Sequence, residues 1–209
     1  MTSTLVIYVR HGRTPTTGVR LPGRSPGLHL SNEGINQAKK VASQLKEAET
    51  NFIGKKVNAI YSSPMERARE TAAPIAEIFG LQTKVINDLN ECEFGTWTGR
   101  KLNDLRKLKA WGKVKNQPSA FRFPEGESFS EMQTRITGQI TELVSHHSNQ
   151  TIVCVSHADP IKAALAYALG TPLDLFQRIT VGPATISMVI YTSEAPIVLT
   201  MNLNSLSLS

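Results

Sequence analysis

The sequence predicts an α/β protein, a three-layer α/β/α sandwich with a mostly parallel central sheet. Two observations lead to this prediction. Short apolar runs rich in β-branched residues alternate along the chain with segments whose apolar residues recur at helical spacing. One of the runs, Thr151–Val155, shows no polar alternation, as is typical of parallel strands buried on both faces. Strands that alternate with helices favour helices packed on both faces of one sheet.

The first half of the chain predicts two strands and two helices. The expected strands are the apolar runs Leu5–Val9 and Val57–Tyr61. A glycine- and proline-rich loop over residues 12–27 follows the first strand, and apolar residues at helical spacing follow that loop. Ser63 and Pro64 predict the start of the second helix, because serine caps helix N-termini and proline is favoured at the first helical position.

The second half of the chain continues the alternation. Its expected elements are, in order, a weak strand over Thr83–Leu89, a short basic helix over Leu102–Trp111, a long helix over Ser128–His147, the strand Thr151–Val155, a helix after it, and a final hairpin of Ala184–Tyr191 and Ile197–Leu203. Ser128 and Glu131 have the spacing of a capping box. Asp159, just before a proline, is expected to cap the last helix, with repulsion of a second anionic group near the site as the alternative.

Length and composition exclude several classes of protein. At 209 residues the chain can bury a sizeable core, and we expect a single domain over residues 1–209. No run approaches 18 apolar residues, so we expect no membrane span and no membrane partner. Cys92 and Cys154 are too few for a disulfide framework and suit a reducing compartment, which predicts a cytoplasmic protein. The sequence leaves the oligomeric state open.

The positive charge of the chain is concentrated in one segment. The formal net charge is +6, and residues 100–115 alone contain seven Lys or Arg side chains against one Asp. Such a patch attracts anions, either a phosphorylated metabolite or a nucleic acid, or it is a solvated helix face. The chain has no helix-turn-helix signal, zinc-ligand spacing or aromatic-rich strand suited to RNA. We therefore expect a small phosphorylated substrate as partner and no nucleic acid.

Polar residues suited to phosphate chemistry follow four successive strands. Arg10 and His11 follow the first, Arg67 lies in the first turn after the second, Glu91 follows the third, and His157 follows the fourth. In open α/β sheets, ligands bind beyond the carboxyl ends of the strands. We therefore expect these side chains to meet at one edge of the sheet.

These residue types match the needs of phosphoryl transfer. Arginine binds phosphate oxygens with a planar, permanently charged fork. A histidine attacks phosphorus when one ring nitrogen keeps its lone pair while the other is held as N–H. A carboxylic acid kept protonated gives its proton to the departing alkoxide. Because side chains supply the cations, we expect neither a metal nor another cofactor.

Five ordered blocks of sequence, between about residues 5 and 170, carry a resemblance to a known family. They are Val9–Thr14, Ser62–Ala72, Leu89–Glu91 with Trp97–Gly99, Glu125–Ser128 and Val155–His157. Together they resemble the motifs of the histidine phosphatase superfamily, the phosphoglycerate-mutase-like proteins. A lone Arg-His-Gly is a weak signal, whereas five such blocks in family order are a specific one.

The resemblance implies a role for each matching position. His11 is the expected nucleophile, which forms a phosphohistidine intermediate, and Glu91 is the expected general acid and base. Arg10, Arg67 and His157 are expected to hold the transferred phosphoryl group. Further phosphate or substrate contacts are implied at Gly12, Thr17, Arg20 and Arg24.

The sequence departs from the family pattern at two places. Many relatives follow the second catalytic histidine with glycines, whereas this chain has Ala158 and Asp159. Arg13 stands where an acidic residue is common, which predicts a more positive pocket.

Three functions are compatible with these motifs. Only 65 residues separate Glu91 from His157, which predicts a small cap formed by an insertion around residues 100–127. A small cap gives water access to a phosphohistidine, so the sequence favours hydrolysis of a small anionic phosphomonoester. The alternatives are a phosphoglycerate-type phosphomutase and a non-catalytic protein that binds a phosphorylated ligand or nucleic acid. The sequence does not indicate which phosphoester is the substrate.

Overall fold

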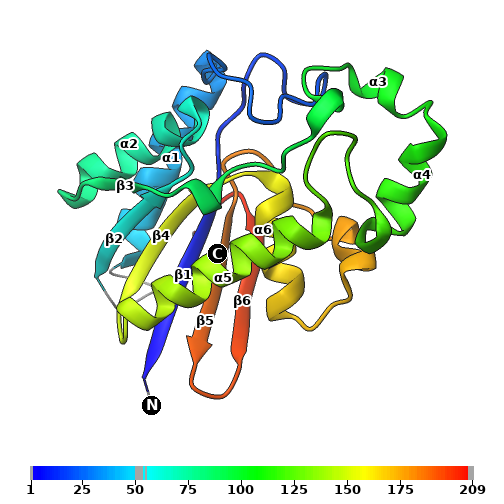
Figure 1. Ribbon diagram of the computed structural model, residues 1–209. Helices are drawn as coiled ribbons and strands as arrows, with labels where there is room; N and C mark the ends of the chain where they lie inside the picture. The colour runs from blue at the N-terminus through cyan, green and yellow to red at the C-terminus, as the bar shows by residue number, and fades with distance from the viewer. Residues whose placement is uncertain (1, 50–53, 55, 207–209) are drawn as a thin grey trace.

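A sheet of six strands organises the part of the chain that the structure describes, residues 2–49, 54 and 56–206 of a computed structural model (Figure 1). The strands lie in the order β3-β2-β4-β1-β5-β6. Their bounds are β1 Ser3–Arg10, β2 Val57–Ser62, β3 Thr83–Val85, β4 Thr151–Ser156, β5 Ile186–Thr192 and β6 Pro196–Leu203.

The sheet is mixed and mostly parallel. Strands β3, β2, β4 and β1 run parallel to one another. Strand β5 runs antiparallel to β1, and β6 pairs antiparallel with β5 to form the expected C-terminal hairpin. The predicted α/β fold class is therefore confirmed. The predicted strand over Thr83–Leu89 is too long: β3 ends at Val85, and Asn87–Leu89 forms a 3₁₀ turn that leads the chain across the end of the sheet.

Helices cover both faces of the sheet. Helices α1 (Asn32–Ala48) and α2 (Glu66–Phe79) pack on one face, and α5 (Phe129–His146) and α6 (Ala158–Ala168) pack on the other (Figure 1). The alternation of β1 explains why both faces are apolar: Ile7 joins the core beneath α1, whereas Tyr8 joins the core beneath α5. No helix within the described ranges is long and apolar enough to cross a membrane.

One of the three predicted helix caps is present. Ser128 Oγ accepts the Glu131 N–H at 3.1 Å, and the Glu131 carboxylate accepts the Ser128 N–H at 2.9 Å, which forms the expected capping box. Ser63 does not cap α2, because the helix begins at Glu66 with Met65 at the cap position, while the Ser63 N–H still continues the sheet by donating to Val155 O at 2.9 Å. Asp159 does not cap α6 either: His157 occupies the cap position, and Asp159 lies in the first turn.

Residues 100–127, here called the cap segment, lie beyond the end of the sheet toward which β1 runs (Figure 1). The predicted single helix over Leu102–Trp111 is two helices, α3 (Leu102–Leu105) and α4 (Lys109–Asn116), because Leu108 has an extended backbone between them. The segment is held by stacked aromatic rings, with Trp97 and Trp111 6.1 Å apart between ring centroids.

Two glycines fix the loop that follows β1 against the start of α1. A Cβ on Gly12 would lie 2.6 Å from the carbonyl oxygen of Gly34, and a Cβ on Gly34 would lie 2.0 Å from that of Arg13. Both distances are shorter than atoms tolerate, so this close approach of two backbones requires glycine at each position.

We predict that Gly34→Ala destabilises the protein by about 1–3 kcal/mol or more, because the new methyl group must displace backbone atoms. For a chain of this length, each kcal/mol lowers Tm by roughly 2–4 °C, which calorimetry measures. Gly138→Ala is the control: Gly138 lies exposed within α5 with no atom near its Cβ position, so alanine there should raise Tm slightly. Equal Tm values for the two variants would contradict the packing argument.

Candidate active site

The parallel pairing of β1 with β4 brings the two sequence-predicted histidines together. Arg10 lies opposite Ser156 in the register, and the next residue continues the ladder, since the His11 N–H donates to Ser156 O at 3.0 Å. His11 and His157 therefore leave adjacent strands side by side. Their ring centroids are 5.1 Å apart, and both side chains are buried.

The tautomer of His11 follows from one hydrogen bond. Its Nδ1 lies 2.7 Å from the carbonyl oxygen of Gly12, which can only accept, so Nδ1 carries the hydrogen and Nε2 keeps its lone pair. Burial, followed by the charges of Arg67 and Arg10, lowers the pKa of His11 well below its usual 6.5. At neutral pH the ring is therefore uncharged, the form in which Nε2 can attack an electrophile.

Arg67 and Ser63 orient the second histidine. The Arg67 guanidinium lies 3.2 Å from Nδ1 of His157, and because arginine only donates, that nitrogen accepts. The remaining hydrogen of the neutral ring is then on Nε2, which donates to Ser63 Oγ at 2.7 Å. Burial and the positive charge of Arg67 lower the pKa of His157 well below 6.5, so this ring is also neutral.

The two arginines keep nitrogens that have no partner. Arg67 is fully buried, and its Nη2 donates to Gly23 O at 2.7 Å, yet its Nε and Nη1 bond to no atom of the described residues. Arg10 uses Nη1 on Val181 O at 2.7 Å and leaves Nε without a partner among those residues. Buried donors without acceptors are rare in native proteins. An anion such as phosphate would supply the missing acceptors.

Glu91 reaches this site on a loop anchored at several points. The Ser156 hydroxyl donates to Leu89 O at 2.7 Å, which ties the 3₁₀ turn to the end of β4. Arg24 Nε donates to the backbone oxygen of Glu91 at 2.8 Å, and Arg135 Nη1 donates to the carbonyl of the preceding residue at 3.1 Å. These contacts fix the Glu91 backbone, and the Glu91 carboxyl lies 4.0 Å from Nδ1 of His157.

The environment of Glu91 suits acid–base chemistry near neutral pH. Burial and then the negative charge of Asp159 raise its pKa from 4.5 to about 7, against the opposing effects of Arg67 and Arg10. A carboxyl group that titrates near 7 both gives and takes protons efficiently at that pH. Asp159, expected from the sequence to be a helix cap, instead contributes charge to the site and pairs with Lys162 at 3.3 Å.

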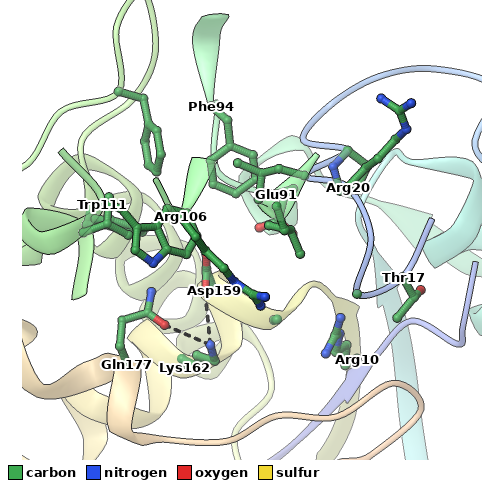
Figure 2. A pocket seen from close by; sticks show the side chains of 18 of the residues that line it. Arg10, Thr17, Arg20, Glu91, Phe94, Arg106, Trp111, Asp159, Lys162 and Gln177 are labelled. Carbon is green, nitrogen blue, oxygen red and sulfur yellow. Dashed lines mark hydrogen bonds and ion pairs between the residues drawn. The ribbon is translucent and has the colours of Figure 1, made fainter. Parts of the chain in front are cut away.

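Arg10, His11 and Glu91 open onto a cavity of about 780 Å³, shown in Figure 2. Thr17 and Arg20 also line it, as the sequence predicts for substrate contacts. Thr17 Oγ1 accepts the Thr14 N–H at 2.9 Å and so also shapes its own loop. The far wall consists of residues of the cap segment and of aromatic side chains next to it.

Five of the positions singled out from the sequence do not line the cavity: Arg67, His157, Arg24, Gly12 and Arg13. Arg24 donates to the Glu91 backbone oxygen at 2.8 Å and pairs with the Glu127 carboxylate at 3.2 Å, so it holds the loop that carries Glu91. Gly12 serves the close approach to α1 described above. Arg13 is exposed and pairs with Glu33 at 3.3 Å on the surface, so its charge acts on the pocket only from a distance, as the smallest of the effects on the pKa of Arg10, which burial mainly lowers.

Sequence reasoning missed the residues that position the site from outside it. Ser63 was assigned to a helix cap, and it orients His157 instead. Arg135 binds both carboxylate oxygens of Glu127 at 2.9 Å while it holds the Glu91 loop. An arginine beside the apolar stripe of α5 was the available signal for this second role. In the described ranges, no three His, Cys, Asp or Glu side chains are grouped so as to hold a metal ion.

A mixed sheet with histidines after its two central strands defines an α/β protein of the phosphoglycerate-mutase-like class. Comparison with known families agrees with this assignment. The family described as "Histidine phosphatase superfamily (branch 1)" matches residues 6–204, and the chain belongs to it.

Its relatives include proteins named as phosphatases and as a mutase. Phosphoserine phosphatase 1 of Hydrogenobacter thermophilus is 29% identical over 206 residues, with 95% of this chain and 92% of that protein covered. The probable phosphoglycerate mutase GpmB of Erwinia tasmaniensis is 28% identical over 187 residues, with 88% and 83% covered. The structure of phosphoserine phosphatase from Entamoeba histolytica in complex with 3-phosphoglyceric acid superposes with a TM-score of 0.83 at 28% identity, with 96% and 97% of the two chains covered.

We predict that inorganic phosphate raises the Tm of the protein through the unpartnered nitrogens of Arg67. At a phosphate concentration about a hundred times its Kd, a ligand of the folded state stabilises by about 2.7 kcal/mol. That corresponds to roughly 5–11 °C in a chain of this size, measured by calorimetry at constant ionic strength. Arg67→Met should abolish the increment, whereas Arg69→Met, an exposed arginine of the same helix, should keep it. An undiminished increment in the first variant would count against an anion site at Arg67.

Proposed function

We propose that this protein hydrolyses phosphomonoesters through a phosphohistidine formed on His11. The observation that carries the proposal is the hydrogen bond from Nδ1 to the Gly12 carbonyl, which leaves Nε2 free near the guanidinium groups of the buried Arg67 and the half-buried Arg10. A phosphomonoester is close to a dianion at neutral pH. Arg10 and Arg67 supply two positive charges, which match that anion and the charge that spreads over its oxygens during transfer.

The reaction proceeds in two steps. In the first, Nε2 of His11 forms a bond to phosphorus, the bond from phosphorus to the ester oxygen breaks, and Glu91 gives its proton to the departing oxygen. In the second, the Glu91 carboxylate takes a proton from water as the water oxygen attacks phosphorus. The nitrogen–phosphorus bond breaks, and inorganic phosphate leaves with His11 neutral again.

Hydrolysis is favoured over isomerisation because water can enter. Exposed side chains such as Arg20 and Lys115 line the same cavity as His11, so the cavity is continuous with solvent. A mutase has to protect its phosphohistidine until the group is returned to substrate. The relatives named phosphoserine phosphatase support the same choice, and the relative named phosphoglycerate mutase keeps isomerisation as the alternative.

The deciding experiment compares variants on two esters, phosphoserine as an alkyl phosphate and p-nitrophenyl phosphate as an aryl phosphate. His11→Ala should remove the hydrolysis of both, since no other nucleophile replaces Nε2. Glu91→Gln should slow the alkyl ester by about 10²–10⁴-fold, because an alkoxide needs the proton, and should slow the nitrophenyl ester far less.

The exposed histidine at the end of α5 provides the control, and His146→Ala should retain full activity. Protein incubated with a ³²P-labelled ester and quenched in alkaline detergent, in which the nitrogen–phosphorus bond of phosphohistidine survives, should carry label in the wild type and none in His11→Ala. Unlabelled wild type with undiminished turnover in His11→Ala would overturn the proposal. Transfer of label to a second substrate molecule in place of release as phosphate would indicate a mutase.

We predict that Asp159 sets the alkaline limit of activity. Glu91 acts as an acid only while protonated, so kcat/KM should fall as the pH rises through its pKa of about 7. Asp159 raises that pKa, and Asp159→Asn should therefore move the limb to lower pH, whereas Lys162→Met should move it upward by leaving Asp159 without its cation. The pH profile of kcat/KM for one substrate measures both shifts. If the alkaline limb of the pH profile lay at the same pH in the wild type and in both variants, the role given to Asp159 would be refuted.

A further inference from the structure

The cap segment turns only two of its eight basic side chains toward the cavity. Arg106 and Lys115 line it, whereas Lys107, Lys109 and Lys113 are exposed and do not. Helical spacing explains the selection, because Lys115 follows Trp111 by four residues in α4 and so shares its face. The positive segment seen in the sequence is therefore divided into a cavity-facing pair and a solvated face.

Neither cavity-facing cation has a carboxylate partner among the described residues. Arg106 donates to the neutral side-chain amide of Asn103 at 3.3 Å, and no ion pair involves Lys115. Lys162, which lines the same cavity, is by contrast already paired with Asp159 and bonded to Gln177 (Figure 2). Figure 2 shows the Arg106 side chain extending into the cavity between Trp111 and Arg10.

One wall of the cavity is apolar and is held by contacts between aromatic rings. It is formed by Leu21, Phe94, Leu102, Trp111, Val114 and Phe123. Trp111 is held by its stacking on Trp97, which in turn contacts Phe123 at 5.4 Å between ring centroids. A wall held in this way loses little side-chain entropy when a ligand packs on it.

The size of the cavity points to a large leaving group. A volume of about 780 Å³ lies in the upper part of the range, roughly 300–1,000 Å³, of pockets that enclose drug-sized ligands. A three-carbon phosphorylated acid would fill only a small part of it. The phosphate end is at Arg10 and His11, so the remaining space belongs to the rest of the substrate.

We propose that Arg106 and Lys115 form a second anion site, and that the substrate is a phosphomonoester whose leaving group has an apolar, ring-sized body and a second anionic group. The inference rests on the proposed phosphatase activity, which places the first phosphate at His11. The apolar body packs along the Trp111 wall, and the second anion, a carboxylate or phosphate, binds the cap cations.

A matched pair of aryl phosphates tests the second anion site. In 4-carboxyphenyl phosphate and 4-carbamoylphenyl phosphate the leaving groups have nearly the same size, and only the first carries a charge. For the wild type, kcat/KM should favour the carboxylate by at least about tenfold, the worth of a charged hydrogen bond. The double variant Arg106→Gln, Lys115→Gln should lose that preference. The matched double variant Lys107→Gln, Lys113→Gln, on the solvated face, should keep it.

The outcomes separate this inference from the proposed function. If the wild type hydrolyses neither aryl ester nor phosphoserine nor 3-phosphoglycerate, the phosphatase proposal itself fails. If it hydrolyses the aryl esters with equal kcat/KM, or if the Arg106, Lys115 variant keeps the preference, only the second anion site is wrong. If kcat/KM were higher for phosphoserine or 3-phosphoglycerate than for 4-carboxyphenyl phosphate, the proposal that the substrate has a large leaving group would be wrong. Trp111→Ala should lower kcat/KM for both aryl esters alike.

Discussion

The parallel pairing of β1 with β4 is the constraint on which the candidate site depends. Because Arg10 stands opposite Ser156, the residues that follow, His11 and His157, emerge at the same level of the sheet. A slip of one residue in this register would turn one of the two side chains to the other face. The register is secured by the core, since Ile7 and Val153 belong to one apolar cluster and Tyr8 and Cys154 to the other. Packing far from the chemistry thus fixes where the chemistry occurs.

Burial and the positive charges of two arginines then set the protonation of both histidines and of Glu91. Burial, followed by the charges of Arg67 and Arg10, lowers the pKa of each histidine and keeps both rings neutral, and neither arginine forms an ion pair with a carboxylate in the described residues. The same charges oppose, without cancelling, the effects of burial and Asp159 on Glu91, whose pKa is about 7. A free imidazole nitrogen and a carboxyl group that titrates near neutrality are complementary requirements of transfer to histidine followed by release to water. One electrostatic arrangement provides both.

Residues outside the site hold the Glu91 loop in position. Arg135 clamps Glu127 and at the same time holds the backbone next to Glu91, while Arg24 reaches the same backbone from the loop after β1. Three segments distant in sequence therefore fix one carboxyl group. The cap segment contributes Trp111, which stacks on Trp97, and two cavity-facing cations, Arg106 and Lys115, which line the same cavity as Arg10 and His11.

The sequence by itself determined the fold class, the order of most elements and the five residues that meet at the sheet edge. It could do so because burial imposes periodicity, and because the carboxyl ends of parallel strands converge whatever the intervening loops do. Only the tertiary structure decided that Ser63 orients His157, that Asp159 charges the site, and that Arg13 and Arg24 lie outside the cavity. Each of these depends on which partner lies within a few ångströms across the fold, and local residue preference carries no information about such partners.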